Sequence, residues 1–176
     1  MHPTAVRRRI YAWPSMITAA AFYAAALSLE TTQGDDGFRV GLALASFALF
    51  FWTIGWDSTY RYTTTHVSTT HFLLTSTVAW QDVSAVETDG GLYLALRDGQ
   101  SLSSIAYGGS LLGTFTGYRT HQAPGTVLSD AHRAATRTSG RRASDPVRIH
   151  RTLAWRRGLL ATALTYTPVL TVAALT

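Results

Sequence analysis

The side chains of this sequence that could hold a ligand are mainly arginines near its C-terminus. Residues 133–157 contain eight arginines and one acid, Asp145, a formal excess of seven positive charges. A basic segment beside a membrane gains about 1 kcal/mol per residue from an anionic leaflet. Nucleic acid is not an expected partner, because no aromatic residue is interleaved before Trp155. We predict that these arginines contact anionic lipid headgroups: Arg133, Arg137, Arg141, Arg142, Arg148, Arg151, Arg156 and Arg157.

The same segment contains a candidate phosphorylation site. Arg141-Arg142-Ala143-Ser144 has the pattern that basophilic kinases recognise, although such short motifs also arise by chance. Phosphate on Ser144 would add about −2 charge and would weaken contact with lipid.

Two further pairs of residues have a structural and a functional interpretation. Trp80 and Asp82 could bind a ligand, but a lone aromatic residue on a strand usually packs in the core. We therefore expect Trp80 inside the sheet, with Asp82 capping a turn or pairing with an arginine. His66 and His71 are five apart across an expected turn, and a metal site needs three or four converging ligands. We interpret both as surface histidines.

No pattern in the sequence indicates catalysis. The glycine-rich stretch 108–113 could suggest a phosphate loop, but a nucleotide-binding loop needs lysine and all 15 basic residues are arginine. We expect a flexible loop there, with anion binding at Arg119 as the alternative. There is no cysteine and no Gly-x-Ser-x-Gly motif. We therefore expect no enzymatic activity, no metal and no cofactor.

Composition indicates a membrane protein. Of the 176 residues, 47% are hydrophobic and 14% charged, against about 25% charged in soluble proteins. Residues 10–29, 40–56 and 158–176 are apolar runs without charge, and about 20 such residues cross a bilayer. We predict three transmembrane helices, the first two forming a hairpin. None of these runs contains an ionisable residue, so we interpret them as anchors.

Small residues spaced four apart indicate how the hairpin packs. Gly41 and Ala45 form one such pair, and Ala20 and Ala24 form another. Such pairs let two helix backbones approach closely.

Arginine placement predicts the orientation of the chain in the membrane. Three arginines precede the first run and four lie just before the third, whereas Glu30, Asp35 and Asp36 fall in the connection between the first two. The positive-inside rule then places the N-terminus and residues 57–157 in the cytoplasm. A cleaved signal peptide is the alternative for the first run, but twenty residues exceed the usual hydrophobic region of about 7–15.

The middle of the chain predicts a small sheet followed by a helix. We expect strands over 60–65, 71–74, 78–88, 92–97 and 101–107, with hairpin turns at residues 89–91 and 98–99. A helix should begin at Pro124 and bury Val127, Leu128, Ala131 and Ala135. The predicted divisions are a hairpin region 1–57, a domain 58–137, a basic linker 138–157 and a third span 158–176.

Several segments resemble bacterial, actinobacterial-type, membrane-anchored proteins with a pleckstrin-homology-like (PH-like) domain. They are Tyr-Arg-Tyr-Thr-Thr-Thr (60–65), Phe-Leu-Leu (72–74), Val-Ala-Trp-Gln-Asp-Val-Ser-Ala-Val (78–86) and Leu-Tyr-Leu-Ala-Leu-Arg-Asp-Gly (92–99). The last two are the most specific. The resemblance implies a bent antiparallel β-roll, capped by a C-terminal helix and preceded by a two-helix hairpin. The sequence departs from the family in showing fewer than seven strands and in having a third span.

These features predict an α+β membrane protein without enzymatic activity, whose cytoplasmic PH-like domain binds a protein or an anionic lipid surface. The alternative is an accessory subunit of a larger membrane enzyme or transporter. A small membrane enzyme that depends on Asp82 or His71 is a third possibility.

Overall fold

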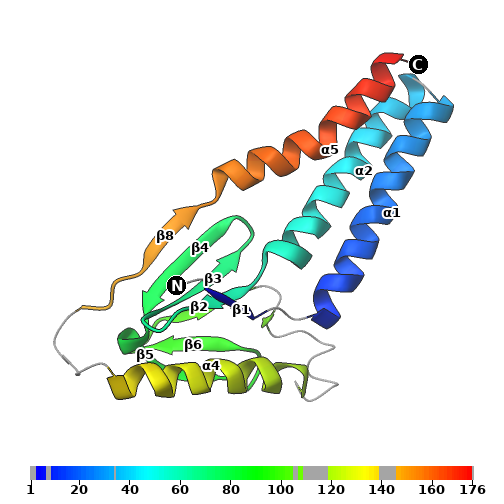
Figure 1. Ribbon diagram of the computed structural model, residues 1–176. Helices are drawn as coiled ribbons and strands as arrows, with labels where there is room; N and C mark the ends of the chain where they lie inside the picture. Colours follow the sequence, from blue (N-terminus) through cyan, green and yellow to red (C-terminus); the bar gives the residue numbers. More distant parts are fainter. Residues whose placement is uncertain are drawn as a thin grey trace. The chain divides into compact units, whose positions relative to one another are not determined.

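The computed structural model describes residues 3–6, 9–33, 35–104, 107–108, 119–138 and 146–175 (Figure 1). It divides into two compact units. The helical unit comprises Arg9–Asp57 and Ala154–Thr176, and the β-rich unit comprises Met1–Arg8 and Ser58–Leu153. The described residues form four α-helices and antiparallel sheets, so the fold is α+β as predicted.

Three long helices make up the helical unit. They are α1 (Arg9–Gln33), α2 (Asp35–Trp52) and α5 (Trp155–Leu175), and a π-helical turn, Thr53–Asp57, continues α2. Each is long and apolar enough to cross a membrane, which confirms the three predicted apolar helices. The third begins at Trp155 and therefore includes two arginines that the sequence analysis had placed in the linker.

Small side chains allow α1 and α2 to pack closely as an antiparallel pair. Ala26 of α1, Ala45 of α2 and Val169 of α5 are fully buried in one cluster. Gly41 is also buried, which confirms the first predicted small-residue pair. The second pair is wrong, because Ala20 and Ala24 are exposed. The buried alanines of α1 are instead spaced seven apart, at positions 12, 19 and 26.

Glu30 is buried within the helical unit, although the sequence analysis had placed it in an exposed connection. Helix α1 continues to Gln33, and Glu30 has no accessible surface. Neither carboxylate oxygen has a hydrogen-bond partner among the described residues. The side chain occupies the space left by Gly41, where an added Cβ would overlap Oε1. The candidate spans are therefore not free of ionisable side chains.

The β-rich unit consists of two antiparallel sheets and one helix (Figure 1). The helix is α4 (Arg119–Thr138). The five-stranded sheet has the order β1 (Thr4–Val6), β2 (Tyr60–Tyr62), β3 (His66–His71), β4 (Leu74–Ala79) and β8 (His150–Leu153). The three-stranded sheet has the order β5 (Val83–Glu87), β6 (Tyr93–Leu96) and β7 (Ser101–Ser103).

Several predicted strands are placed differently in the structure. The strand expected over 60–65 ends at Tyr62, and the turn expected between His66 and His71 is strand β3. The strand expected over 71–74 is a turn, because β3 pairs His71 with Leu74 of β4. Phe72 adopts a positive φ of 52° in this turn, a conformation that its sequence does not suggest. The strand expected over 78–88 is broken by a 3-10 turn, Trp80–Asp82. At this turn the chain passes from the five-stranded sheet to the other sheet.

The predicted meander is confirmed by β5, β6 and β7. Both turns contain glycines with positive φ, including Gly90 at 71° and Gly99 at 84°. Leu94 and Leu96 are buried, whereas Tyr93, Ala95 and Arg97 are partly exposed, as the alternation predicted.

The predicted helix is also confirmed, but α4 begins at Arg119, before Pro124. Its buried face includes Gly125, Leu128 and Ala135, whereas Val127 is 43% exposed, contrary to expectation.

Hydrogen bonds between buried groups join the two sheets. The Tyr60 hydroxyl, on β2, donates to the Leu92 carbonyl at 2.9 Å. The Ser104 hydroxyl, which follows β7, donates to the Thr70 carbonyl of β3 at 2.9 Å. Tyr107 packs edge-on against Tyr60, with ring centroids 5.0 Å apart. The core therefore lies between the sheets. It consists of aliphatic side chains together with aromatic side chains whose polar groups are hydrogen-bonded.

Both edge strands of the larger sheet come from segments that the sequence analysis assigned elsewhere. β1 precedes α1, and β8 lies in the predicted linker. The register brings the C-terminal end of β1, the N-terminal end of β2 and the C-terminal end of β8 to the same end of the sheet. All three covalent links to the helical unit therefore leave the sheet at that end.

We predict that a larger side chain at position 45 will destabilise the helical unit. Ala45 is fully buried, and overpacking a well-packed contact typically costs about 1–3 kcal/mol. Ala45→Leu should lower the thermal unfolding midpoint in detergent. Ala43→Leu is the matched control, since Ala43 is exposed on the same helix. Equal midpoints for the two variants would contradict the packing described above.

We also predict an alkaline loss of stability that depends on Tyr60. Burial, and next the nearby Tyr107, raise the pKa of the Tyr60 phenol above its ordinary value. Above about pH 10 the unfolded chain releases a proton that folded Tyr60 retains, so the free energy of unfolding should fall as pH rises. The measurement is chemical denaturation at several alkaline pH values. The fall should be shallower in Tyr60→Phe, and parallel curves for the two proteins would refute this assignment.

Candidate functional site

The structure distributes the predicted basic residues over three elements. Arg133 and Arg137 lie on the exposed side of α4, where Arg133 forms an exposed pair with Asp130 at 3.4 Å. Arg148 and Arg151 lie exposed before and on β8. Three further predicted site residues fall outside the described residues: Arg141, Arg142 and Ser144.

The last two arginines lie in the first turn of α5. The Arg157 guanidinium is 3.6 Å from the carboxylate of Asp57, which is itself buried. The Arg156 guanidinium lies over the Trp155 ring, 5.3 Å from its centroid. Arg157 therefore has a structural partner within the helical unit. Local sequence patterns do not predict this pair, because Asp57 is a hundred residues away in the chain.

A pocket of about 430 Å³, here called the edge pocket, lies along β4 and beside β8. It brings together polar and basic side chains from β3, from β4 and the turn after it, and from the segment that leads into β8. These include His66, Thr77, Gln81, Asp82, Arg148 and His150. The pocket exists because β8 pairs with β4.

Strand register explains why the two histidines of the edge pocket share one face. His66 of β3 pairs with Ala79 of β4, and His150 of β8 pairs with Thr77 of β4. Directly paired residues project to the same face of a sheet, as do residues two apart on one strand. The small Ala79 and Thr77 side chains therefore lie between the two imidazole rings.

The His66 ring is oriented by a neighbouring hydroxyl. Its Nδ1 lies 2.8 Å from Oγ1 of Thr65. When this hydroxyl donates to Nδ1, the neutral ring carries its proton on Nε2 and can donate a hydrogen bond there.

His66 and His71 do not converge. They are the first and last residues of β3 and, being five apart on one strand, project from opposite faces. Within the described ranges, no three or more His, Cys, Asp or Glu residues lie close enough to hold a metal ion.

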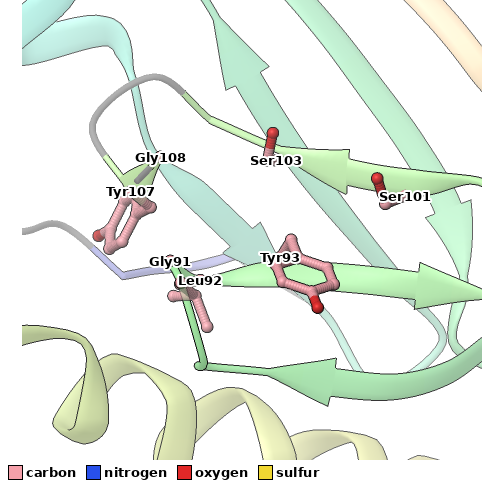
Figure 2. A pocket seen from close by; sticks show the side chains of 8 residues that line it. Gly91, Leu92, Tyr93, Ser101, Ser103, Tyr107 and Gly108 are labelled. Atoms are coloured by element: carbon pink, nitrogen blue, oxygen red, sulfur yellow. The ribbon is translucent and has the colours of Figure 1, made fainter. Parts of the chain in front are cut away.

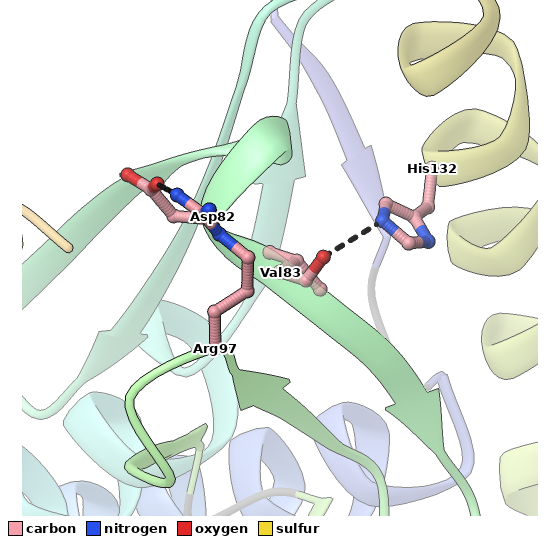
Figure 3. A network of polar contacts seen from close by, with 4 residues as sticks. All are labelled: Asp82, Val83, Arg97 and His132. Atoms are coloured by element: carbon pink, nitrogen blue, oxygen red, sulfur yellow. Dashed lines mark hydrogen bonds and ion pairs between the residues drawn. The ribbon is translucent and has the colours of Figure 1, made fainter. Parts of the chain in front are cut away.

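Asp82 and Trp80 have the structural roles expected for them. Figure 3 shows the Asp82 carboxylate accepting a hydrogen bond from the Arg97 guanidinium at 2.6 Å. It also shows the His132 ring of α4 beside the Val83 carbonyl, with Nε2 at 3.0 Å. The Trp80 indole is buried and donates to the Thr63 carbonyl at 2.9 Å. These contacts hold the turn between the sheets and connect it to the helix.

A second pocket, of about 190 Å³, lies beside the paired strands β6 and β7, next to the turn that precedes β6 (Figure 2). Glycines, Leu92, Tyr93, Tyr107, Ser101 and Ser103 line it. No carboxylate, imidazole or basic group is among these residues, so it offers fewer means of recognising a charged ligand than the edge pocket. The glycine-rich loop expected over 108–113 lies outside the described residues from position 109 onward, as does the Arg119 side chain.

No protein-family model, curated protein or solved structure shows significant similarity to the chain.

We predict that Asp82 stabilises the β-rich unit through Arg97. The Asp82 side chain is 7% exposed and that of Arg97 21%. Removing the carboxylate leaves the partly buried guanidinium without this hydrogen bond, and such bonds to charged groups contribute about 1.5–3 kcal/mol. Asp82→Ala should lower the free energy of unfolding by about that amount.

Asp130→Ala is the control for this prediction, since it removes an exposed pair worth at most about 1 kcal/mol. Both variants are compared with the wild type by chemical denaturation. A loss for Asp82→Ala no greater than that for Asp130→Ala would show that the ion pair does not hold the turn.

Proposed function

We propose that this protein is an integral membrane protein whose β-rich unit is a non-enzymatic, PH-like interaction domain. In this proposal α1, α2 and α5 span a bacterial plasma membrane, and the β-rich unit faces the cytoplasm. The domain binds an anionic lipid surface or a protein. The observation that carries the proposal is a β-rich unit with four exposed arginines, Arg133, Arg137, Arg148 and Arg151, joined by three links to three helices that are long and apolar enough to span a membrane.

The arrangement of elements supports the PH-like part of the proposal. Two antiparallel sheets enclose a shared core. In the chain α4 follows β7, the last strand of the smaller sheet, and in space it lies along that sheet, beside β5 (Figure 1). This agrees with the β-roll and C-terminal helix that the sequence resemblance implies. β1 and β8 are additions at the two edges of the larger sheet.

The short links to the helical unit support the membrane-facing part. Two residues separate β1 from α1, and one residue separates β8 from α5. Because β1, β2 and β8 connect at the same end of their sheet, an anchored domain would be tethered there. The arginines at 148, 151, 156 and 157 all lie within ten residues of the start of α5 or in its first turn, where attraction to an anionic leaflet is greatest.

Exposure of the arginines supports binding to a lipid surface. Arg133, Arg137, Arg148, Arg151 and Arg156 are all exposed. Arginine can donate to phosphate in a bidentate manner. Attraction of this kind extends over about 10 Å at 0.1 M salt and only about 3 Å at 1 M, so it should be strongly salt-dependent.

Vesicle flotation tests this function. The full-length protein in phosphatidylcholine nanodiscs should float with vesicles that contain phosphatidylglycerol at about 0.1 M salt, and should lose this association near 1 M. Vesicles of phosphatidylcholine alone serve as the control. Flotation should weaken progressively as exposed arginines are replaced by glutamine, because each contributes about 1 kcal/mol.

Two results would contradict binding to a lipid surface. One is equal flotation with both kinds of vesicle. The other is no flotation together with a stoichiometric protein partner after gentle detergent extraction, which would favour an accessory subunit of a larger membrane complex.

A further inference from the structure

We propose that the edge pocket binds the phosphate group of an anionic ligand through Arg148, His66 and His150. This inference rests on the proposed function, since it identifies the chemical class of anionic ligand that the exposed arginines of the β-rich unit attract. It adds a defined site, with directional hydrogen-bond donors, to the general attraction of a positive surface for anions.

The pocket offers donors from several directions. Arg148 provides a planar guanidinium, His66 and His150 provide ring nitrogens, and Gln81 provides an amide. His66 and His150 stand on either side of β4, two residues apart in register, with Ala79 and Thr77 between them. A phosphate group presents several acceptor oxygens, so His66 and His150 can donate to it from the two sides of the edge pocket.

The charge within the pocket favours an anion. Asp82 is the one acid among the lining residues, and Arg97 pairs with it at 2.6 Å. Within the described part of the chain Arg148 forms no ion pair, and its side chain is exposed. The guanidinium of Arg148 is thus the positive charge that remains to attract a ligand.

The volume suits a phosphate group with an attached organic group. The pocket measures about 430 Å³, within the range of about 300–1,000 Å³ for small-molecule sites. A lipid headgroup and a free phosphate compound would present the same phosphate chemistry to these donors.

The first experiment follows the histidine ring resonances of the full-length protein in dodecyl maltoside, a detergent without phosphate. The probes are inorganic phosphate, glycerol 3-phosphate and short-chain phosphatidic acid. Of the six histidines, we expect only those at 66 and 150 to shift, as assigned with His66→Gln and His150→Gln. Tighter binding of phosphatidic acid would identify a lipid headgroup, and tighter binding of the water-soluble probes would identify a free phosphate compound; either supports the site.

A matched pair of variants separates the pocket from general charge. Arg148→Gln and Arg151→Gln each remove one exposed positive charge, but Arg151 pairs with Ser76 in the strand register and does not line the pocket. Arg148→Gln should weaken phosphate binding about tenfold or more, whereas Arg151→Gln should leave it nearly unchanged. Equal thermal unfolding midpoints for the two variants will show that the difference does not reflect misfolding.

The inference is overturned if no probe shifts the resonances of His66 and His150, or if both arginine variants weaken binding equally. These outcomes are distinct from failure of the proposed function. Vesicle flotation depends on the summed charge of many arginines, so it can succeed without a phosphate pocket, and soluble phosphate can bind in the pocket of a protein that does not float.

Discussion

The 3-10 turn Trp80–Asp82 is the constraint on which the β-rich unit depends. It carries the chain from β4 in one sheet to β5 in the other. The turn is held from three directions, since the Trp80 indole donates to the Thr63 carbonyl, Asp82 pairs with Arg97, and the Trp80 ring lies 5.7 Å from that of His132 on α4. Both sheets and the helix therefore meet at one buried tryptophan, and a displaced turn would separate all three.

The same turn relates the structural contacts to the candidate site. Asp82 lines the edge pocket while its carboxylate pairs with Arg97, so the acid of the pocket lies beside the basic groups with much of its charge balanced. On the other side of the pocket, β8 and the segment leading into it add His150 and Arg148 beside a sheet that would otherwise end at β4. The site thus combines residues of β3, of β4 and of the turn after β4 with a short edge strand, β8, whose residues are all exposed. Since the segment that forms β8 leads directly into α5, the edge of the sheet and the start of a candidate span are covalently continuous.

The helical unit follows a different principle. Its helices are long and apolar enough to span a membrane, and helices in such a water-free environment associate through close packing and a few polar contacts. Ala26, Ala45 and Val169 provide the close contact, and the Ser46 and Tyr166 hydroxyls, 2.6 Å apart, provide a polar link between α2 and α5. Glu30 is an exception to this apolar packing, because its carboxylate is buried in the space beside Gly41.

The sequence by itself determined the features that depend on composition and on local periodicity. Length and apolar character identified the three long helices, and alternation with glycine turns identified the β5–β7 meander, because these signals lie within about twenty consecutive residues. Only the tertiary structure decided which distant residues meet. β8 was not predicted, since His150–Leu153 has no clear alternation and is held by its ladder to β4. The edge pocket, the Asp57–Arg157 pair and the burial of Glu30 were equally invisible, because each arises where segments far apart in the chain pack together.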